Sequence, residues 1–202
     1  MMKRAILGHN AGIPQVGFTG RAWLRLAVWA SFLMCLRAAG GADPLITLEY
    51  RVKGGYLYNF ARFVEWPPGS LPLPDSPFII GVLDGGDITP ILRSLLDGKQ
   101  VDAHPVQVKQ VTLARAEKGL QMLFVTRAAG SSPKEVQALV GPTGTLVVGE
   151  TEHFAEEGGM VGFTREEDRI RVCLNLERAS AAGLKVSSKL ASVARLVRTR
   201  EP

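Results

Sequence analysis

Residues 78–98, with the sequence FIIGVLDGGDITPILRSLLDG, decide the fold that we predict for this chain. The apolar run 78–83 is typical of a strand covered on both faces, because a strand with one face in water alternates polar and apolar residues. A turn rich in Asp and Gly follows, and Thr89-Pro90 begins a helix that ends at Leu96. Strand, turn and helix in this order are the repeating unit of an α/β sheet.

The chain continues in the same way after this unit. Three further strands are expected, and a helix opened by Ser132-Pro133 runs to Val140 between the last two of them. Strands separated by short helices favour parallel pairing. The three strands are 105–111, 121–125 and 145–148.

The pattern changes after residue 160. Residues 161–164 and 169–174 flank a charged turn, which predicts an antiparallel hairpin at one edge of the sheet. The predicted fold class is therefore α/β, with a mostly parallel central sheet flanked by helices and an antiparallel edge hairpin near the C-terminus.

Two short helices are predicted to close the chain. Asn175 can cap the first, and Gly183 ends it. The second is expected from Ser187 or Ser188 to Arg198, with basic residues around one side. Its apolar side consists of Leu190, Val193, Ala194 and Val197.

Residues 45–66, which precede the first strand, predict a long amphipathic helix. Its stripe of apolar residues comprises Leu48, Val52, Tyr56, Phe60, Phe63 and Val64. The helix ends at Trp66, because Pro67-Pro68-Gly69 cannot continue it. Gly54-Gly55 costs about 1 kcal/mol per residue relative to alanine, so we expect another segment to approach this face closely.

Six aromatic residues gather in this helix, and one buried stripe cannot hold them all. They either pack in the core beneath the proline-rich connector 67–77, or form an aromatic partner surface or ligand groove. The pattern favours core packing but leaves both interpretations open. The six are Tyr50, Tyr56, Tyr58, Phe60, Phe63 and Trp66.

The first 42 residues predict a secretory signal peptide. Basic residues precede the apolar run 26–36, and small residues lead to a cleavage site after Ala42. Eleven residues rise about 16 Å as a helix, roughly half of the ~30 Å hydrocarbon core, so a permanent anchor is not expected. The alternative is a buried N-terminal helix. Residues 43–202 would then form the exported domain, without an integral membrane segment.

The net charge of +5 belongs to this leader. Five of the 24 basic residues lie in 1–42, which holds no Asp or Glu, so the remaining 19 balance the 19 acidic residues. A nucleic-acid-binding protein needs a basic face. We therefore predict no nucleic-acid partner.

No motif in the sequence carries a named reaction. The turn at 84–87 lacks nucleotide-binding fingerprints, and Asp84 and Asp87 are interpreted as turn formers. His104 and His153 are not spaced as metal ligands. We therefore expect no catalytic residues, no metal and no cofactor. A hydrolase that uses Asp84, His104 or His153 is the weakest hypothesis.

Cys173 and a group of glutamates are also given structural interpretations. Cys173 would be the one cysteine of the exported chain, and the alternation around it predicts a strand and a buried, inert thiol. An intermolecular bridge stays open as a minor alternative. Glutamates near the hairpin predict a solvated acidic surface rather than a catalytic pair. They are Glu156, Glu157, Glu166 and Glu167.

Three segments resemble the YfiR-like family. Residues 52–67, VKGGYLYNFARFVEWP, are similar to its opening signature KAAFLYNFAKFVEWP. Residues 154–163, FAEEGGMVGF, resemble its FA..GGMI.F segment, and Asn175-Leu with GLKVSSKL at 183–190 resembles its closing segment. Gly54-Gly55 and Gln121 depart from the family, which usually has two alanines and often a cysteine there.

The resemblance implies a periplasmic α/β protein, often a homodimer, without enzymatic activity. The founding member is a repressor that acts through the periplasmic domain of a membrane diguanylate cyclase, lowering cyclic-di-GMP output and biofilm formation. The resemblance thus favours a partner that is a membrane-bound signalling protein, either a diguanylate cyclase or a sensor kinase. Because the family is broad, an outer-membrane receptor is a further alternative. A periplasmic small-molecule-binding protein is the alternative.

The segments that carry the resemblance also supply the expected partner-binding residues. They come from the aromatic helix, the loop at 157–161 and the last helix. The expected residues are Tyr56, Tyr58, Asn59, Phe63, Trp66, Glu157, Gly158, Gly159, Met160, Ser188 and Lys189.

Overall fold

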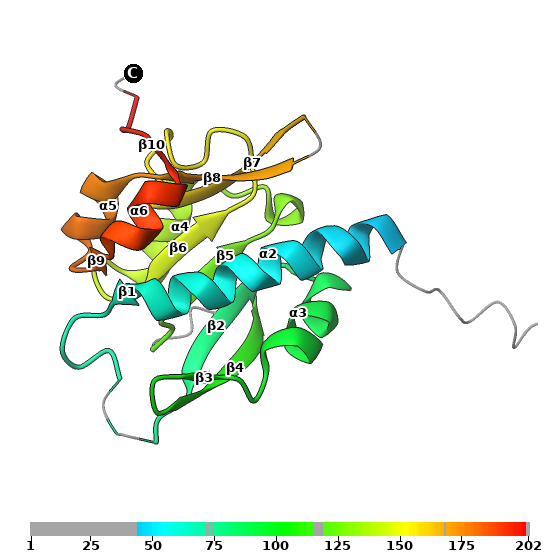
Figure 1. The fold of residues 1–202 in the computed structure, drawn as a ribbon, viewed down its shortest axis with the longest axis vertical. Helices are drawn as coiled ribbons and strands as arrows, with labels where there is room; N and C mark the ends of the chain where they lie inside the picture. The colour runs from blue at the N-terminus through cyan, green and yellow to red at the C-terminus, as the bar shows by residue number, and fades with distance from the viewer. Residues whose placement is uncertain (1–43, 72, 74, 115–118, 168, 201–202) are drawn as a thin grey trace, which may run out of the picture. The chain divides into compact units, whose positions relative to one another are not determined.

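The computed structural model describes residues 44–71, 73, 75–114, 119–167 and 169–200, and the predicted leader, residues 1–42, lies outside them. Helix α2 comes first, and α3, α4, α5 and α6 alternate with the strands that follow (Figure 1). The helices are α2 (Pro44–Phe63), α3 (Ile88–Leu96), α4 (Pro133–Val140), α5 (Leu176–Ala181) and α6 (Ser188–Val193), with a short 3₁₀ turn η2 (Arg127–Ala129).

The main sheet of the described residues has eight strands in the order β10-β8-β7-β6-β5-β2-β4-β3. Pairing is parallel except between β7 and β8 and between β3 and β4, which confirms the predicted mostly parallel α/β sheet. Its strands are β2 (Phe78–Leu83), β3 (Gln100–Val101), β4 (His104–Val111), β5 (Met122–Val125), β6 (Leu146–Gly149), β7 (Val161–Glu166), β8 (Arg169–Leu174) and β10 (Arg195–Leu196).

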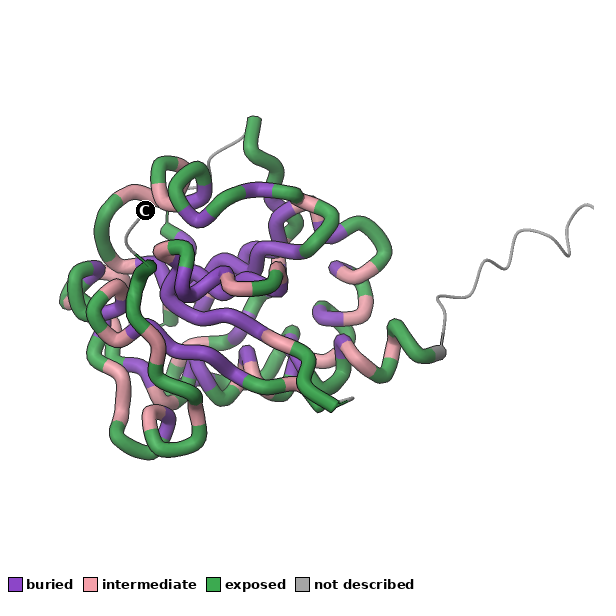
Figure 2. The backbone as a smooth tube through the Cα atoms, turned by 90° about the horizontal axis from the view of Figure 1, so that it is seen from above, coloured by how far each residue is buried: buried purple, intermediate pink, exposed green. Residues whose placement is uncertain are grey.

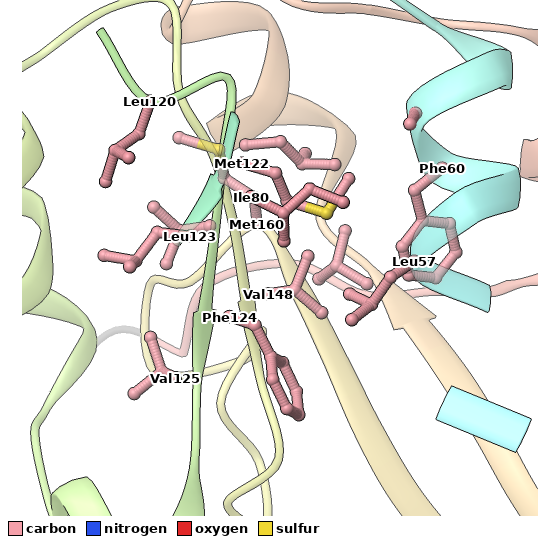
Figure 3. Packing of buried hydrophobic residues seen from close by; sticks show 14 of the residues in the cluster. Leu57, Phe60, Ile80, Leu120, Met122, Leu123, Phe124, Val125, Val148 and Met160 are labelled. Atoms are coloured by element: carbon pink, nitrogen blue, oxygen red, sulfur yellow. The ribbon is translucent and has the colours of Figure 1, made fainter. Parts of the chain in front are cut away.

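Helices pack on both faces of the sheet. Leu57 and Phe60 point from α2 toward Phe124 and Val148, whereas Leu123 lies on the other side of the strands (Figure 3). Neighbours on one strand, such as Leu123 and Phe124, are both fully buried, which is why β5 is a continuous apolar run without alternation.

The predicted hairpin forms between β7 and β8, but it does not lie at the sheet edge. Arg195 and Leu196 pair in parallel with Cys173 and Leu174, so β10 is the edge strand. The prediction of a last helix to Arg198 is therefore wrong beyond Val193. Ala194 is extended, and the Val197 amide donates to the Leu174 carbonyl at 3.0 Å. The backbone here satisfies the free side of β8 instead of continuing the helix.

The predicted helix 45–66 is three residues shorter at its C-terminal end. β1 (Val64–Glu65) leaves the helix to pair antiparallel with β9 (Lys185–Val186) in a separate two-stranded sheet. The Ser187 amide also donates to the Phe63 carbonyl at 2.9 Å, which supplies one of the unpaired carbonyls at the helix end.

Buried Gln121, where relatives often have cysteine, anchors the proline-rich connector by hydrogen bonds. Its side-chain amide donates to the Ser70 carbonyl at 2.6 Å and accepts from the Ile79 amide at 2.7 Å. Its backbone carbonyl accepts the indole N–H of Trp66 at 2.9 Å. These contacts tie both ends of the connector to the sheet.

The two adjacent glycines of α2 have different surroundings. A Cβ on Gly54 would lie 3.3 Å from Leu92 and Leu95 of α3, which confirms the expected close approach at this position. A Cβ on Gly55 would have no heavy atom within 4 Å. Gly54 therefore serves the contact between α2 and α3, whereas no contact of the described residues requires glycine at 55.

Replacing Gly55 by alanine should stabilise the isolated protein. Alanine gains about 1 kcal/mol over glycine inside a helix, and its methyl group would enter open space. Urea denaturation should show Gly55→Ala more stable than wild type by roughly this amount. Gly54→Ala is the matched control, expected to gain less because Leu92 and Leu95 must move; an equal gain at both positions would contradict the packing described.

Candidate functional site: a groove beside helix α2

A groove of about 700 Å³ lies between the N-terminal half of α2 and the β7–β8 hairpin. Figure 2 shows the first turns of α2 largely exposed, in contrast to the buried strands beneath. The groove is lined by Leu45, Ile46, Leu48, Glu49, Val52, Lys53, Tyr56, Arg127, Glu150, Phe163, Thr164, Arg165, Arg169, Ile170 and Arg171.

A buried ion pair forms part of the groove lining. Lys53 of α2 bonds Glu150, which follows β6, and the two residues are 3% and 2% exposed. The Tyr50 hydroxyl donates to the same carboxylate at 2.8 Å, and the Arg127 backbone amide donates to it at 2.7 Å. Lys53 also pairs with Glu49 at 2.5 Å. The network joins α2 to the carboxyl ends of β5 and β6.

Burial and the neighbouring charge act on Tyr50 in the same direction. Burial raises the pKa of its hydroxyl well above the usual value, and the Glu150 carboxylate raises it further. Tyr50 therefore stays protonated and keeps donating to Glu150. The arrangement positions α2 against the ends of β5 and β6.

Glu49 links this network to the groove wall. The hydrogen bond from Lys53 holds the pKa of the Glu49 carboxyl below its usual value of 4.5, and the charges of Lys53, Arg165 and Arg127 act the same way. A lowered folded-state pKa means that the charged form adds stability above the unfolded value, and that this is lost as pH falls through the folded value.

Glu49→Gln should therefore destabilise the protein at pH 7 and have little effect in strong acid. Below the folded-state pKa, Glu49 is protonated and uncharged in the wild type too, so the two proteins should have similar stabilities. Thermal denaturation of both proteins in steps from pH 7 into strong acid measures this, and the difference between them should shrink as the pH falls. A difference between the two proteins that does not change with pH would contradict the assignment.

Four arginines contribute to the lining of the groove. Arg165, Arg169 and Arg171 come from the hairpin, and Arg127 comes from η2. Glu166 pairs with Arg171 at 3.7 Å, whereas the carboxylates of Glu49 and Glu150 both bond Lys53. Among the lining residues five are basic and two are acidic, so the groove is cationic above an apolar wall.

The aromatic residues expected to bind a partner are half-buried and mostly engaged within the chain. Tyr56 faces the groove and packs on Phe60 and Phe163, with ring centroids 6.2 and 5.8 Å away. Tyr58 donates to the Gln100 carbonyl at 2.9 Å, on the side of β3. Trp66 packs edge-on against Phe78 at 4.9 Å. Core packing therefore accounts for much of this aromatic cluster.

Phe63, Ser188 and Lys189 lie together at the C-terminal end of α2. The Lys189 ammonium lies 5.4 Å from the centroid of the Phe63 ring, and Ser188 and Lys189 are exposed at the start of α6. Asn59 is exposed one turn earlier on α2. The structure thus brings these expected residues onto adjoining parts of the surface.

The loop residues among the expected set divide between surface and core. Met160 is 2% exposed, and Gly159 is buried where a Cβ would overlap the Phe154 ring. Glu157 and Gly158 line a smaller groove of about 400 Å³ with residues of α4, not the groove that Tyr56 lines. Gly159 and Met160 are therefore buried residues that help to fix the conformation of the loop, whereas Glu157 and Gly158 are the accessible ones.

Glu156 departs from the solvated acidic surface that the sequence predicts. It is buried and pairs with Arg195 at 3.1 Å, with His153 at 3.3 Å and with Arg200. Glu157 and Glu167 are exposed as expected. The sequence showed glutamates near basic residues, but their pairing depends on β10, which was expected to be helical.

Lys53 and Glu150 were not singled out in the sequence. Glu150 directly follows an apolar strand, and Lys53 is a part of the YfiR-like signature, but they are 97 residues apart. The available signal was a charged residue directly after the apolar strand 146–149 and a lysine inside the amphipathic helix. Their pairing required knowing that α2 crosses the end of β6.

The residues considered for catalysis are occupied by structural contacts. The His104 Nδ1–H donates to the Ser76 carbonyl at 2.8 Å, and His153 pairs with Glu156. Cys173 is buried in β8, as predicted. Within the described part of the chain, no group of three His, Cys, Asp or Glu side chains could hold a metal ion. No helix there is long and apolar enough to cross a membrane.

The comparisons with known proteins identify the family. Residues 50–195 match the family model described as YfiR/HmsC-like, from the first helix to β10. The comparison with curated proteins gives no match. The matched range includes the buried Lys53–Glu150 pair, the loop at 157–160 and α6. This chain belongs to the YfiR-like family.

Proposed function

We propose that this chain is a periplasmic regulatory protein that binds the extracytoplasmic domain of an inner-membrane signalling protein and represses its output. The observation that carries the proposal is the match of residues 50–195 to the YfiR-like family, whose theme is periplasmic regulation of diguanylate cyclases. A diguanylate cyclase is therefore the partner we favour over a sensor kinase. The protein itself acts by binding, without catalysis.

Export is part of this proposal. Residues 1–42 act as a signal peptide that is cleaved after Ala42, and the exported domain works outside the cytoplasm, as a homodimer. The balanced charge of residues 43–202 suits a binding protein with local rather than global electrostatics.

Repression follows from a difference in affinity for two states of the partner. A bound protein shifts an equilibrium only as far as it binds one state more tightly than the other. Moving a partner from 99% active to 99% inactive takes about a 10⁴-fold preference for the inactive state. The contact surface must therefore bind one conformation of the partner more tightly than the other, because equal affinity for both would not shift the equilibrium.

The surface near the end of α2 is one candidate contact. Phe63 and Lys189 combine an apolar ring with a cation, and Asn59 and Ser188 add exposed polar groups. Half-buried aromatics beside exposed polar groups are typical of interface centres. We assign Tyr58, Trp66, Glu157 and Gly158 to the margins of this contact surface.

Capture from solubilised membranes tests the proposal. The exported domain carrying a C-terminal affinity tag should retain one membrane protein that has an extracytoplasmic domain and a cyclase or kinase output domain. Lys189→Glu should weaken this retention, whereas Arg198→Glu, which changes an 86% exposed arginine outside the proposed surface, should not. Retention of no such membrane protein would contradict the proposed function.

Small-molecule binding is the second candidate, and the groove favours it. A volume of about 700 Å³ lies in the range of ligand pockets, about 300–1,000 Å³. A ligand present at 100 times its Kd would add about 2.7 kcal/mol to stability. A metabolite screen by thermal melting measures this, and a screen without shifts would exclude ligands of that affinity among those tested.

A further inference from the structure

Exposed apolar residues form a stripe along the N-terminal half of α2. Leu45, Leu48 and Val52 are 76%, 60% and 44% exposed, and they are spaced by three and four residues. This spacing places them on one side of the helix, and such a seam is what one helix presents to another.

Gly55 continues the same spacing, three residues after Val52. A Cβ there would have no heavy atom of the described residues within 4 Å, so the fold does not explain the glycine. A missing side chain on an exposed seam lets a second helix approach closely, as Gly54 does for α3 on the other side of α2. Gly55 is thus an observation independent of the apolar residues.

The charged residues beside the seam indicate whether the segment that binds there is acidic or basic. Arg165 and Arg169 of the hairpin and Arg127 of η2 line the groove that the seam borders. The lining has five basic residues and only two acidic ones, Glu49 and Glu150, so its net charge is positive although Glu49 interacts with Lys53, Arg165 and Arg127. A ligand that places apolar groups on Leu48 and Val52 would therefore be best matched by carboxylates facing the arginines.

The length of the groove fits a helical segment. Leu45 to Tyr56 are the first and last residues of α2 in its lining, and eleven steps of about 1.5 Å give roughly 16 Å, or three helical turns. We propose that this groove receives an acidic amphipathic α-helix of the membrane signalling partner, lying along α2 with its apolar side on Leu45, Leu48 and Val52 and crossing at Gly55. This inference rests on the proposed function and names a second contact, distinct from the surface around Phe63 and Lys189.

Site-specific crosslinking in living cells tests the proposal. The photoreactive residue p-benzoylphenylalanine is placed at Leu48 in the groove lining or at Gly55, which is exposed on the same seam. The other two positions are Lys189 on the other surface and Leu73, an exposed apolar residue of the connector. The crosslinked peptides are identified by mass spectrometry. We expect crosslinks from positions 48 and 55 to one acidic amphipathic segment of a membrane signalling protein, and none from position 73.

Charge reversal supplies the second arm of the experiment. Arg165→Glu with Arg169→Glu should lower the crosslinking yield from position 48 at least tenfold. Arg198→Glu, which changes an 86% exposed arginine that pairs with Glu177, should leave it unchanged. Circular dichroism of each variant verifies that the domain is folded. An unchanged yield for the hairpin variant would overturn the charge argument and the proposal with it.

The remaining outcomes separate this inference from the proposed function. Crosslinks to a membrane signalling protein from position 189 alone would overturn the groove proposal and leave the proposed function standing. Adducts at 48 and 55 with a second copy of this chain, a lipid or a small molecule would also overturn it. Absence of any membrane-protein crosslink from 48, 55 and 189 would contradict the proposed function itself.

Discussion

Replacing Lys53 by methionine is expected to lower the free energy of unfolding by about 3–5 kcal/mol. The change removes the cation that neutralises Glu150, a carboxylate that is 2% exposed, and leaves a buried charge without its partner. For an exported domain of this size the melting temperature should fall by roughly 6–20 °C. Urea denaturation followed by circular dichroism measures the effect.

A matched pair on the surface supplies the control. Lys185 also pairs with a glutamate, Glu65 at 4.0 Å, but both side chains are largely exposed. Lys185→Met should therefore cost less than about 1 kcal/mol. In the double variant Lys53→Met with Glu150→Gln, much of the loss should be recovered, because no unpaired charge remains. Equal effects of Lys53→Met and Lys185→Met would show that the buried pair does not hold α2.

The second large effect is expected at Phe154, which fixes the loop between β6 and β7. Its ring is fully buried and fills the space that Cβ atoms on Gly149 and Gly159 would occupy. Phe154→Ala should cost about 3–5 kcal/mol, because it removes a large buried side chain and leaves a cavity. Gly149→Ala should cost roughly 1–3 kcal/mol or more by forcing the ring to move.

The two substitutions should not add. Once Phe154 is alanine, a methyl group on Gly149 has no ring to displace, so Gly149→Ala should have little effect or a small benefit in that background. A double-mutant cycle from urea denaturation provides this comparison. Additive losses would mean that the glycine acts through backbone conformation and not through contact with Phe154. A Cβ on Gly159 would overlap the same Phe154 ring, which accounts for the second glycine of the segment resembling FA..GGMI.F.

The repeating strands and helices could be predicted from sequence because their signals are local. The apolar run 78–83 forms β2, and Ser132-Pro133 begins α4 with a capping box in which Ser132 and Glu135 bond each other's backbone amides. Asn175 caps α5 through its side chain, which accepts from the Arg178 amide at 3.1 Å. Each of these features depends on residues only a few positions apart.

The errors have a common cause, which is pairing between distant segments. β1, β3, β9 and β10 contain two residues each, too few for a periodic pattern, and they form where another strand supplies hydrogen bonds. The helical pattern of Leu190, Val193 and Val197 was real, but the free side of β8 held the chain in an extended form from Ala194. Local propensity gave way to tertiary contact there.

The candidate site was predicted in part. The resemblance directed attention to α2, and Tyr56 does line the groove. The aromatic residues were emphasised because they are conspicuous in sequence, yet the exposed seam consists of aliphatic residues one turn or more before them. The arginines of the hairpin and η2 reach the groove through the sheet order, which places β7 and β8 beside α2's N-terminal half. Single-sequence periodicity does not contain that information.

Cyclic-di-GMP in a deletion strain tests the central claim of repression from outside the cytoplasm. In the organism that encodes this chain, deletion of its gene should raise the cyclic-di-GMP concentration. Expression of the full chain in the deletion strain should return the concentration to the wild-type level. Residues 43–202 expressed without the leader should leave the concentration raised, although this domain folds. An unchanged concentration after deletion, or full restoration by the leaderless protein, would contradict the account.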